Sequence, residues 1–139
     1  MSLASLRILF VCVVLLASLV PASAVEPTKD SLETVKKNLA EKQAVLVDVR
    51  SLDEWKEGHV EGALHLPLAE IKKRSTDKEA LAKWLAEQLP ADKIVYVHCM
   101  AGIRAKQACG LLEPADKRDW RCLKAGYEDL LDAGLPKAK

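Results

Sequence analysis

The fold of this 139-residue chain is decided by the stretch Ile94-Val95-Tyr96-Val97-His98-Cys99-Met100-Ala101-Gly102-Ile103-Arg104. The apolar run Ile94 to Val97 indicates a buried strand, and the residues from about Ile103 to Leu112 have the pattern of a helix. Cys99 then leaves a strand and enters a helix N-terminus, where free backbone N–H groups and the helix dipole favour a thiolate. Arg104 adds a positive charge on the same loop. We expect nucleophilic sulfur chemistry on a small anion.

Strands alternate with helices along the rest of the chain. The other predicted strands are Ala44 to Val47, which ends at Asp48, Ala63 to Leu66, and Trp120 to Leu123. A helix capped by Asp30 and a short helical turn at Asp53 to Lys56, which stops at Gly58, are predicted in the first half of the domain. A longer helix is predicted to begin at Thr76, with Glu79 completing a capping box, and to end at Pro90. The last predicted helix is Tyr127 to Asp132. The run Lys72-Lys73-Arg74 is interpreted as a solvated loop. This order predicts an α/β domain with a small, mostly parallel β-sheet flanked by helices on both faces and a site at the carboxyl ends of the strands.

The first 24 residues have the pattern of a secretory signal peptide. Arg7 precedes the apolar run Ile8 to Val20, and Ala22-Ser23-Ala24 follows as an A-x-A cleavage site. The run is shorter than the roughly 20 apolar residues that span a bilayer. We expect cleavage after Ala24 and export to a periplasmic or extracellular location, with a retained anchor helix as the alternative.

Residues 25–139 are enough for one small domain and too few for two. The whole chain has 21 Lys+Arg against 20 Asp+Glu, and losing Arg7 makes the two numbers equal. A balanced charge gives no reason to expect nucleic acid or, after signal cleavage, a membrane surface as a partner.

Three cysteines remain after cleavage: Cys99, Cys109 and Cys122. Their odd number leaves at least one free thiol in a monomer. We expect Cys99 to be that free and accessible thiol, because its chemistry requires a reachable sulfur. Cys109 and Cys122 lie on predicted core faces, where they either stay reduced or pair with each other. No zinc-like spacing is present, so no metal site is predicted.

Three segments resemble, in order, the sequence signatures of single-domain rhodaneses. They are Leu46 to Arg50 with Glu54-Trp55, Gly58 to Ala63 and Leu66-Pro67-Leu68; Tyr96 to Arg104; and Leu123 to Tyr127 with Ala133 to Pro136. The resemblance covers about Ser31 to Pro136 and implies a rhodanese-like domain over residues 25–139. It implies a sulfurtransferase that moves a sulfane sulfur from thiosulfate or a similar small anionic donor to a thiophilic acceptor, such as cyanide or a thiol, through a cysteine persulfide. No cofactor is implied.

The resemblance also implies roles for the site residues. Cys99 would be the nucleophile and persulfide carrier, and Arg104 would close the loop or hold the sulfonate end of the donor. The anionic sulfur would be cradled by the backbone N–H groups of Met100, Ala101, Gly102, Ile103 and Arg104. Asp48 and Arg50 would organise the loops around the end of the sheet.

Two other functions fit parts of the same pattern. A persulfide carrier or redox module without turnover would exchange sulfur with a thiol-bearing partner protein. The loops of cysteine phosphatases and arsenate reductases also place a cysteine and an arginine around an oxyanion, but they resemble His-Cys, five residues, then Arg. This chain has Ala105 at that position, and its shorter loop suits a sulfur atom better than a phosphate. His98 is expected to be structural, because its side chain leaves the strand on the opposite face from Cys99.

Overall fold

Four parallel strands form the sheet of the computed structural model, which describes residues 25–139. The predicted signal peptide, residues 1–24, lies outside the described residues. The sheet order is β2-β1-β3-β4. The strands are β1 (Ala44–Asp48), β2 (Leu64–His65), β3 (Ile94–His98) and β4 (Asp119–Cys122). The two long apolar runs thus occupy the centre, with Asp48 beside His98 at the carboxyl edge.

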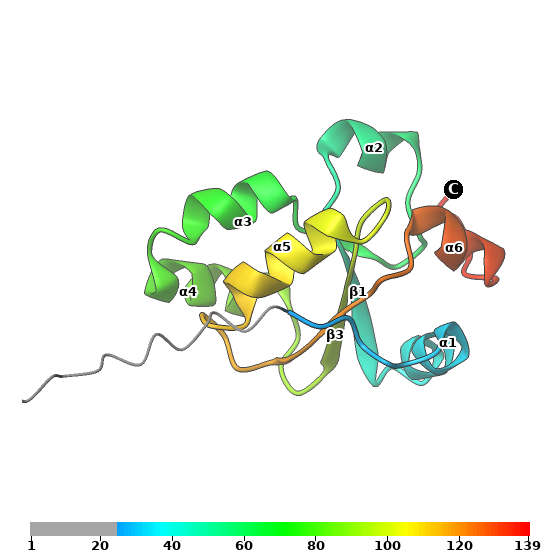
Figure 1. Ribbon diagram of the computed structural model, residues 1–139, viewed down its shortest axis with the longest axis horizontal. Coiled ribbons are helices and arrows are strands. Elements are labelled where there is room, and N and C mark those ends of the chain that lie inside the picture. Colours follow the sequence, from blue (N-terminus) through cyan, green and yellow to red (C-terminus); the bar gives the residue numbers. More distant parts are fainter. Residues whose placement is uncertain (1–24) are drawn as a thin grey trace, which may run out of the picture.

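Helices cover both faces of the sheet, which confirms the predicted α/β class (Figure 1). The helices are α1 (Leu32–Ala40), α2 (Leu52–Glu57), α3 (Leu68–Arg74), α4 (Lys78–Gln88), α5 (Ile103–Leu112) and α6 (Tyr127–Asp132). Side chains from α3, α4 and α5 share one core cluster, and those from α1 and α6 share the other. No helix within residues 25–139 is long and apolar enough to cross a membrane.

Alternation along the central strands divides the core into these two layers. Val95 and Val97 pack under α3, α4 and α5, whereas Tyr96 packs on the other face with α1 and α6. Successive side chains of a strand point to opposite faces, so a strand buried on both sides has to be apolar throughout. Residues such as Val95, Tyr96 and Val97 are completely buried.

The sequence interpretation missed α3. This helix occupies the segment that was interpreted as a basic loop, and it buries Leu68 and Ile71 while Lys72, Lys73 and Arg74 remain exposed. Two apolar residues three positions apart are too short a pattern to separate a helix from a loop. The tertiary contact with the core decides its structure.

Two predicted helix caps are wrong by one residue. Ser31 caps α1 by accepting a hydrogen bond from the Thr34 N–H, because the Asp30 carboxylate instead accepts from the Tyr96 hydroxyl at 2.6 Å. Asp77 caps α4, and the hydroxyl of Thr76 donates to the carbonyl of Lys73 instead. In both helices the side-chain oxygen that caps the helix therefore belongs to the residue next to the predicted one.

Trp55 lies outside both core clusters, although tryptophan is usually a core residue. Its half-buried indole lies between the imidazoles of His59 and His65, with ring centroids 3.5 and 4.7 Å away and the rings nearly parallel. His65 also donates to the carbonyl of Arg50 at 2.8 Å, and His59 bonds the carbonyl of Trp55. The stack ties α2 to the end of β2.

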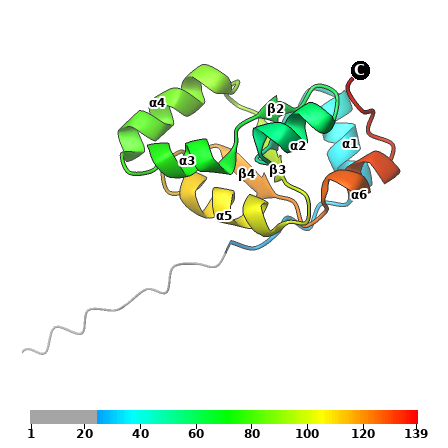
Figure 2. The ribbon, with the colours of Figure 1, turned by 90° about the horizontal axis from the view of Figure 1, so that it is seen from above.

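The carboxyl edge of the sheet is where α2, the loop before α5 and α6 meet. Seen from above, α2 and α6 flank the loop that leads from β3 into α5 (Figure 2). The Val49 N–H bonds the carbonyl of His98, and the Leu123 N–H bonds the carbonyl of Val97. These bonds continue the sheet pairing into the loops that surround Cys99.

Candidate functional site

Cys99 follows the last residue of β3, and its sulfur lies against the first turn of α5. The Sγ atom accepts hydrogen bonds from the backbone N–H of Gly102 at 3.0 Å and of Ala105 at 3.4 Å. N–H groups in the first turn of a helix have no partner within the helix, and the positive end of its dipole lies there. This position stabilises negative charge on the sulfur.

Gly102 gives the loop its shape. It is the N-cap of α5 with φ of 91°, in the left-handed region. A Cβ atom at this position would stand 3.0 Å from the carbonyl oxygen of Lys124. Glycine is therefore favoured both by its backbone angle and by the close approach of the neighbouring chain.

The bonds to Sγ concern the unmodified thiol, so the predicted cradle of Met100 to Arg104 around a persulfide sulfur stays a prediction. Gly102 donates to the sulfur as expected, and Ala105, which the sequence interpretation left out, donates as well. Within the described chain, the N–H groups of Met100, Ala101, Ile103 and Arg104 make no hydrogen bond to Sγ. A donor one turn into the helix was missed because the loop was judged by sequence proximity.

The sulfur is less exposed than expected. Cys99 is a free cysteine but only 1% of its surface is accessible, so the expectation of an accessible thiol is wrong. The loop folds over the sulfur while the side chains of Met100 and Ile103 point outward, 41% and 70% exposed. Only a small or projecting group can reach Sγ.

Arg104 is engaged by a carboxylate that the sequence did not single out. Its two terminal nitrogens donate to Glu54 of α2 at 2.5 and 3.0 Å. Hydrogen bonds from this guanidinium lower the pKa of Glu54 to about 2, and the same bonds raise the pKa of Arg104. The structure thus uses the guanidinium fork to fasten α2 to α5 instead of leaving it open toward the sulfur.

Asp48 and Arg50 form a buried pair below the loop. Nε and Nη2 of Arg50 bond the Asp48 carboxylate at 2.7 to 3.0 Å, and Nη2 also bonds the carbonyl of Gly58 at 2.8 Å. The guanidinium lies over the ring of Tyr127, 4.0 Å from its centroid. The structure therefore places these two residues where they join the ends of β1, α2 and α6.

His98 completes this buried group on the far side from the sulfur. Its Nε2 lies 3.6 Å from Oδ2 of Asp48 and forms no hydrogen bond, and Nδ1 lies 3.3 Å from the carbonyl oxygen of Cys99. Burial lowers the pKa of His98, which favours the neutral ring. A fully buried imidazole in contact with main chain and carboxylate is not placed to act on the sulfur.

Helix α6 leans directly on the loop through Gly126. The Tyr127 N–H donates to the carbonyl of Cys99 at 3.0 Å. A Cβ atom on Gly126 would come within 1.8 Å of the carbonyl oxygen of Met100. The sequence indicated a turn at this glycine but not the backbone contact that requires it.

Cys109 and Cys122 are both buried, as their predicted core faces indicated. Both are free, so the structure has the reduced form of the two alternatives. They lie on α5 and β4 in the same core cluster as Cys99. A hydrogen bond between the two thiols, together with burial, raises the pKa of Cys109. They are placed as packing residues, and neither donates to the Cys99 sulfur.

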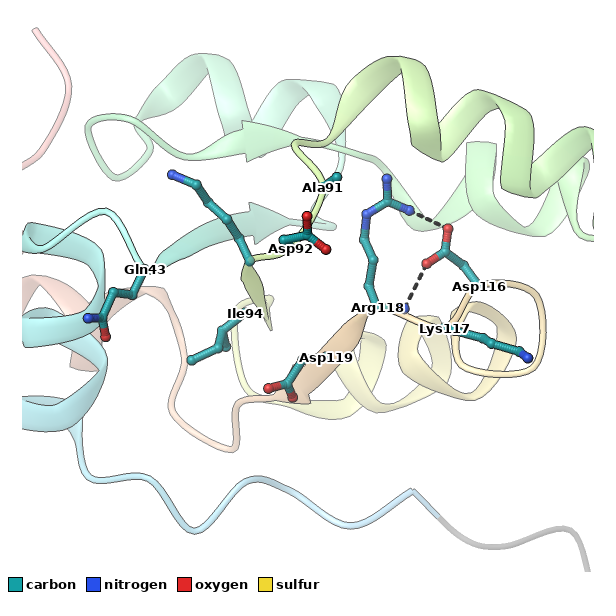
Figure 3. Close-up of a pocket in the computed structure, with 9 residues that line it drawn as sticks. Gln43, Ala91, Asp92, Ile94, Asp116, Lys117, Arg118 and Asp119 are labelled. Carbon is teal, nitrogen blue, oxygen red and sulfur yellow. Dashed lines mark hydrogen bonds and ion pairs between the residues drawn. The ribbon is translucent and has the colours of Figure 1, made fainter.

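A cavity lies at the edge of the sheet opposite Cys99, where the strands begin (Figure 3). It has a volume of about 420 Å³. It is lined by Gln43, Ala91, Asp92, Lys93, Ile94, Asp116, Lys117, Arg118 and Asp119. Arg118 is already bonded to Asp116 and to the carbonyls of Leu89 and Pro90. No cysteine or histidine lines this cavity, so we place the functional site at Cys99.

The protein is a parallel α/β domain in which the sulfur of one cysteine accepts hydrogen bonds from backbone N–H groups. The chain belongs to the rhodanese-like domain family, and the model of that family matches residues 31–133. This membership confirms the family that the three sequence segments indicated.

Individual relatives agree with this assignment. The human single-domain sulfurtransferase TSTD1 is 28% identical with a TM-score of 0.62, and the match covers 78% of this chain and 97% of that one. The rhodanese-like Alr3790 protein of Anabaena is 22% identical with a TM-score of 0.63 over 78% of this chain and 90% of that one, which shows the fold alone.

Two Bacillus subtilis (strain 168) proteins are each 29% identical in sequence. They are "Uncharacterized protein YqhL", over 63% of this chain, and "Putative sulfur carrier protein YrkF", over 56% of it. The matches span only 60% and 37% of those proteins' own lengths.

Replacing Glu54 by glutamine is expected to destabilise the protein in a pH-dependent way. The pKa of Glu54 is depressed, so its contribution is present above its ordinary value of 4.5 and is lost as the pH falls through about 2. We expect Glu54→Gln to lower the free energy of unfolding by about 0.5–1 kcal/mol at pH 7. Urea unfolding at pH 7, 4 and 2.5 should show the difference from wild type shrinking. Glu70→Gln, in an exposed pair with Arg74, should have a smaller effect at pH 7; equal effects would contradict the prediction.

Replacing Gly126 by alanine is expected to disturb the loop as well as the fold. The added methyl group overlaps the carbonyl of Met100, so the variant should lose about 1–3 kcal/mol in urea unfolding. The matched control is Gly110→Ala in α5, where a Cβ meets only Val25 at 3.7 Å. That variant should gain about 0.5–1 kcal/mol. A Gly126→Ala protein as stable as wild type would refute the contact.

Proposed function

We propose that this protein is a sulfurtransferase that carries a sulfane sulfur on Cys99 between a small anionic donor, such as thiosulfate, and cyanide or a thiol. The observation that carries the proposal is the position of Sγ, which accepts N–H bonds from Gly102 and Ala105 in the first turn of α5. An anionic sulfur is the species that such a cradle stabilises.

The reaction has two balanced steps. In the first, the Cys99 thiolate attacks the outer sulfur of thiosulfate, a new S–S bond forms, and the donor S–S bond breaks so that sulfite leaves with the electron pair. In the second, the acceptor attacks the outer sulfur of the persulfide and Cys99 leaves as a thiolate. The cysteine returns to its starting state, and neither step draws on a cofactor.

Family membership and two relatives support sulfur transfer in general. TSTD1 is described as a sulfurtransferase and YrkF as a sulfur carrier with the qualification "putative". The names therefore fit both turnover and the alternative of a carrier that holds one sulfur for a thiol-bearing partner protein. Thiosulfate and cyanide as the reacting pair are part of our proposal.

The arrangement of Arg104 argues against a phosphatase or arsenate reductase. The loops of those enzymes resemble a cysteine, five residues and then an arginine, whereas Arg104 comes one residue earlier here and Ala105 stands at the expected position. Here both terminal nitrogens of Arg104 are bonded to Glu54, and Arg50 is bonded to Asp48 and Gly58. Backbone N–H groups at the sulfur remain, and these suit a single sulfur atom.

We also propose that the protein acts after export to a periplasmic or extracellular compartment. The support is the pattern of Arg7, the apolar run from Ile8 and Ala22-Ser23-Ala24. In such a compartment the persulfide on Cys99 faces oxidants, and its burial limits their access.

Cys99→Ser is expected to abolish sulfur loading while the protein stays folded. Intact mass spectrometry after incubation with thiosulfate should show a gain of one sulfur atom in the wild type and none in the variant. Cys109→Ala, at a buried cysteine away from the cradle, is the control and should still load. A gain of sulfur by Cys99→Ser would refute the assignment.

Turnover separates an enzyme from a carrier. With thiosulfate and cyanide in excess, an enzyme releases many thiocyanate molecules per chain, whereas a carrier stops at one. Loading followed by release of many equivalents is the outcome that we expect.

A further inference from the structure

Exposed apolar side chains gather around the Cys99 loop. Among residues 25–139, the large apolar side chains that are well exposed are Leu52, Met100 and Ile103, at 53%, 41% and 70%. Met100 and Ile103 belong to the loop, and Leu52 begins α2, which Glu54 joins to Arg104. Single exposed apolar residues are ordinary, but three around one reactive group mark an interaction site.

A groove of about 280 Å³ continues this apolar region on the side of β4. Its walls include Pro27, Ala101, Ile103 and Leu123. Two exposed lysines, Lys106 and Lys124, also line it, and no carboxylate does. Neither lysine forms an ion pair within the described residues. We call Leu52, Met100, Ile103, Lys106 and Lys124 the docking surface.

A second cavity, of about 270 Å³, lies on the other side of Arg104 and has the same character. Pro67 and Leu68 line it together with the exposed Lys72, and it also contains no carboxylate. The loop is therefore bordered by apolar and positively charged residues on two sides, although the chain as a whole is close to neutral. On its third side, toward α6, Met100 lines a hollow with Glu54, Glu57 and Glu128, so the acidic residues of a partner have to face Lys106 and Lys124. Local charge of one sign attracts a partner of the opposite sign.

We propose that the docking surface binds a protein that presents its acceptor cysteine on an apolar segment flanked by acidic residues. This proposal rests on the sulfur transfer proposed above. Cys99 is only 1% exposed, so an acceptor sulfur has to project into the loop and be held there. Contacts of a partner with Leu52 and Ile103 supply that positioning, which a small free thiol lacks.

A membrane surface fits the same residues less well. Lysines beside apolar side chains also suit an anionic bilayer. However, a bilayer offers no thiol, and it would cover the loop through which sulfur has to pass. The position of the docking surface around the cysteine thus favours a thiol-bearing protein.

The transfer step needs no other reactant. The thiolate of the partner cysteine attacks the outer sulfur of the Cys99 persulfide, the S–S bond to Sγ breaks, and Cys99 leaves as a thiolate. The partner cysteine, which reacts as a thiolate after losing one proton, becomes a persulfide. Both sulfur and electrons balance without an oxidant.

The test uses three synthetic peptides of equal length, each with one cysteine. The first flanks the cysteine with leucine and glutamate, the second replaces glutamate by lysine, and the third replaces leucine by serine. The protein is loaded with thiosulfate, freed of donor and mixed with each peptide, and peptide persulfide is followed by mass spectrometry. We expect the leucine and glutamate peptide to react about tenfold faster than the lysine peptide at low salt, with the gap narrowing as salt is added.

Variants of the protein locate the effect. The pair Lys106→Glu and Lys124→Glu should slow transfer to the acidic peptide about tenfold and leave transfer to free cysteine unchanged. The control pair Lys37→Glu and Lys83→Glu makes the same charge change on exposed lysines of α1 and α4 and should have no effect. Leu52→Ser should slow only the peptides that carry leucine.

The outcomes separate the two proposals. Failure of Cys99 to load sulfur would refute the proposed function itself. Normal loading with equal transfer to all three peptides, or with no effect of the lysine variants, would overturn the docking proposal alone. It would also be overturned by a dimer in analytical ultracentrifugation that Leu52→Ser dissociates, or by binding to phosphatidylglycerol vesicles that the lysine variants abolish.

Discussion

A guanidinium group with almost no access to water can be held in a protein only when its charge and its donors are satisfied. Arg50 is 1% exposed, and Asp48, the Gly58 carbonyl and the Tyr127 ring surround it. Removing either charge from such a pair leaves the other buried alone, at a cost of several kcal/mol. Because the three partners come from β1, the end of α2 and α6, satisfying this one side chain fixes the elements that enclose the Cys99 loop.

Arg104, the second arginine near the loop, was expected to hold the donor or close the loop, but in the structure it binds a carboxylate of α2. Arg104 holds α2 against α5 through Glu54, and so the positive character at the sulfur comes mainly from backbone N–H groups. Backbone donors are fixed in place by the helix and do not depend on the rotamer of a long side chain. Fixed N–H donors of this kind suit a small anionic atom.

The sequence predicted what is encoded locally. Apolar runs such as Ile94 to Val97, followed by a glycine-containing turn and a helical pattern, defined the strands, the longer helices and the position of Cys99. The sequence analysis missed the features that depend on contacts between residues far apart in the chain. Glu54 and Arg104 are 50 residues apart, α3 is helical because Leu68 and Ile71 reach the core, and Gly126 is required by the carbonyl of Met100. The burial of the Cys99 sulfur belongs to the same group, since the N–H of Tyr127 in α6 bonds the carbonyl of Cys99.

The contact between Gly126 and Met100 links reactivity to the order of synthesis. Tyr127 and Gly126 follow Cys99 in the chain, yet their backbones define the shape of the loop that precedes them. A nascent chain that has completed β3 and α5 therefore contains the cysteine and both N–H donors, but it lacks the α6 backbone that packs against the loop. The thiol acquires its final environment only after the segment that forms α6 has been made and has docked, so the reactivity that we propose for Cys99 depends on the assembled domain.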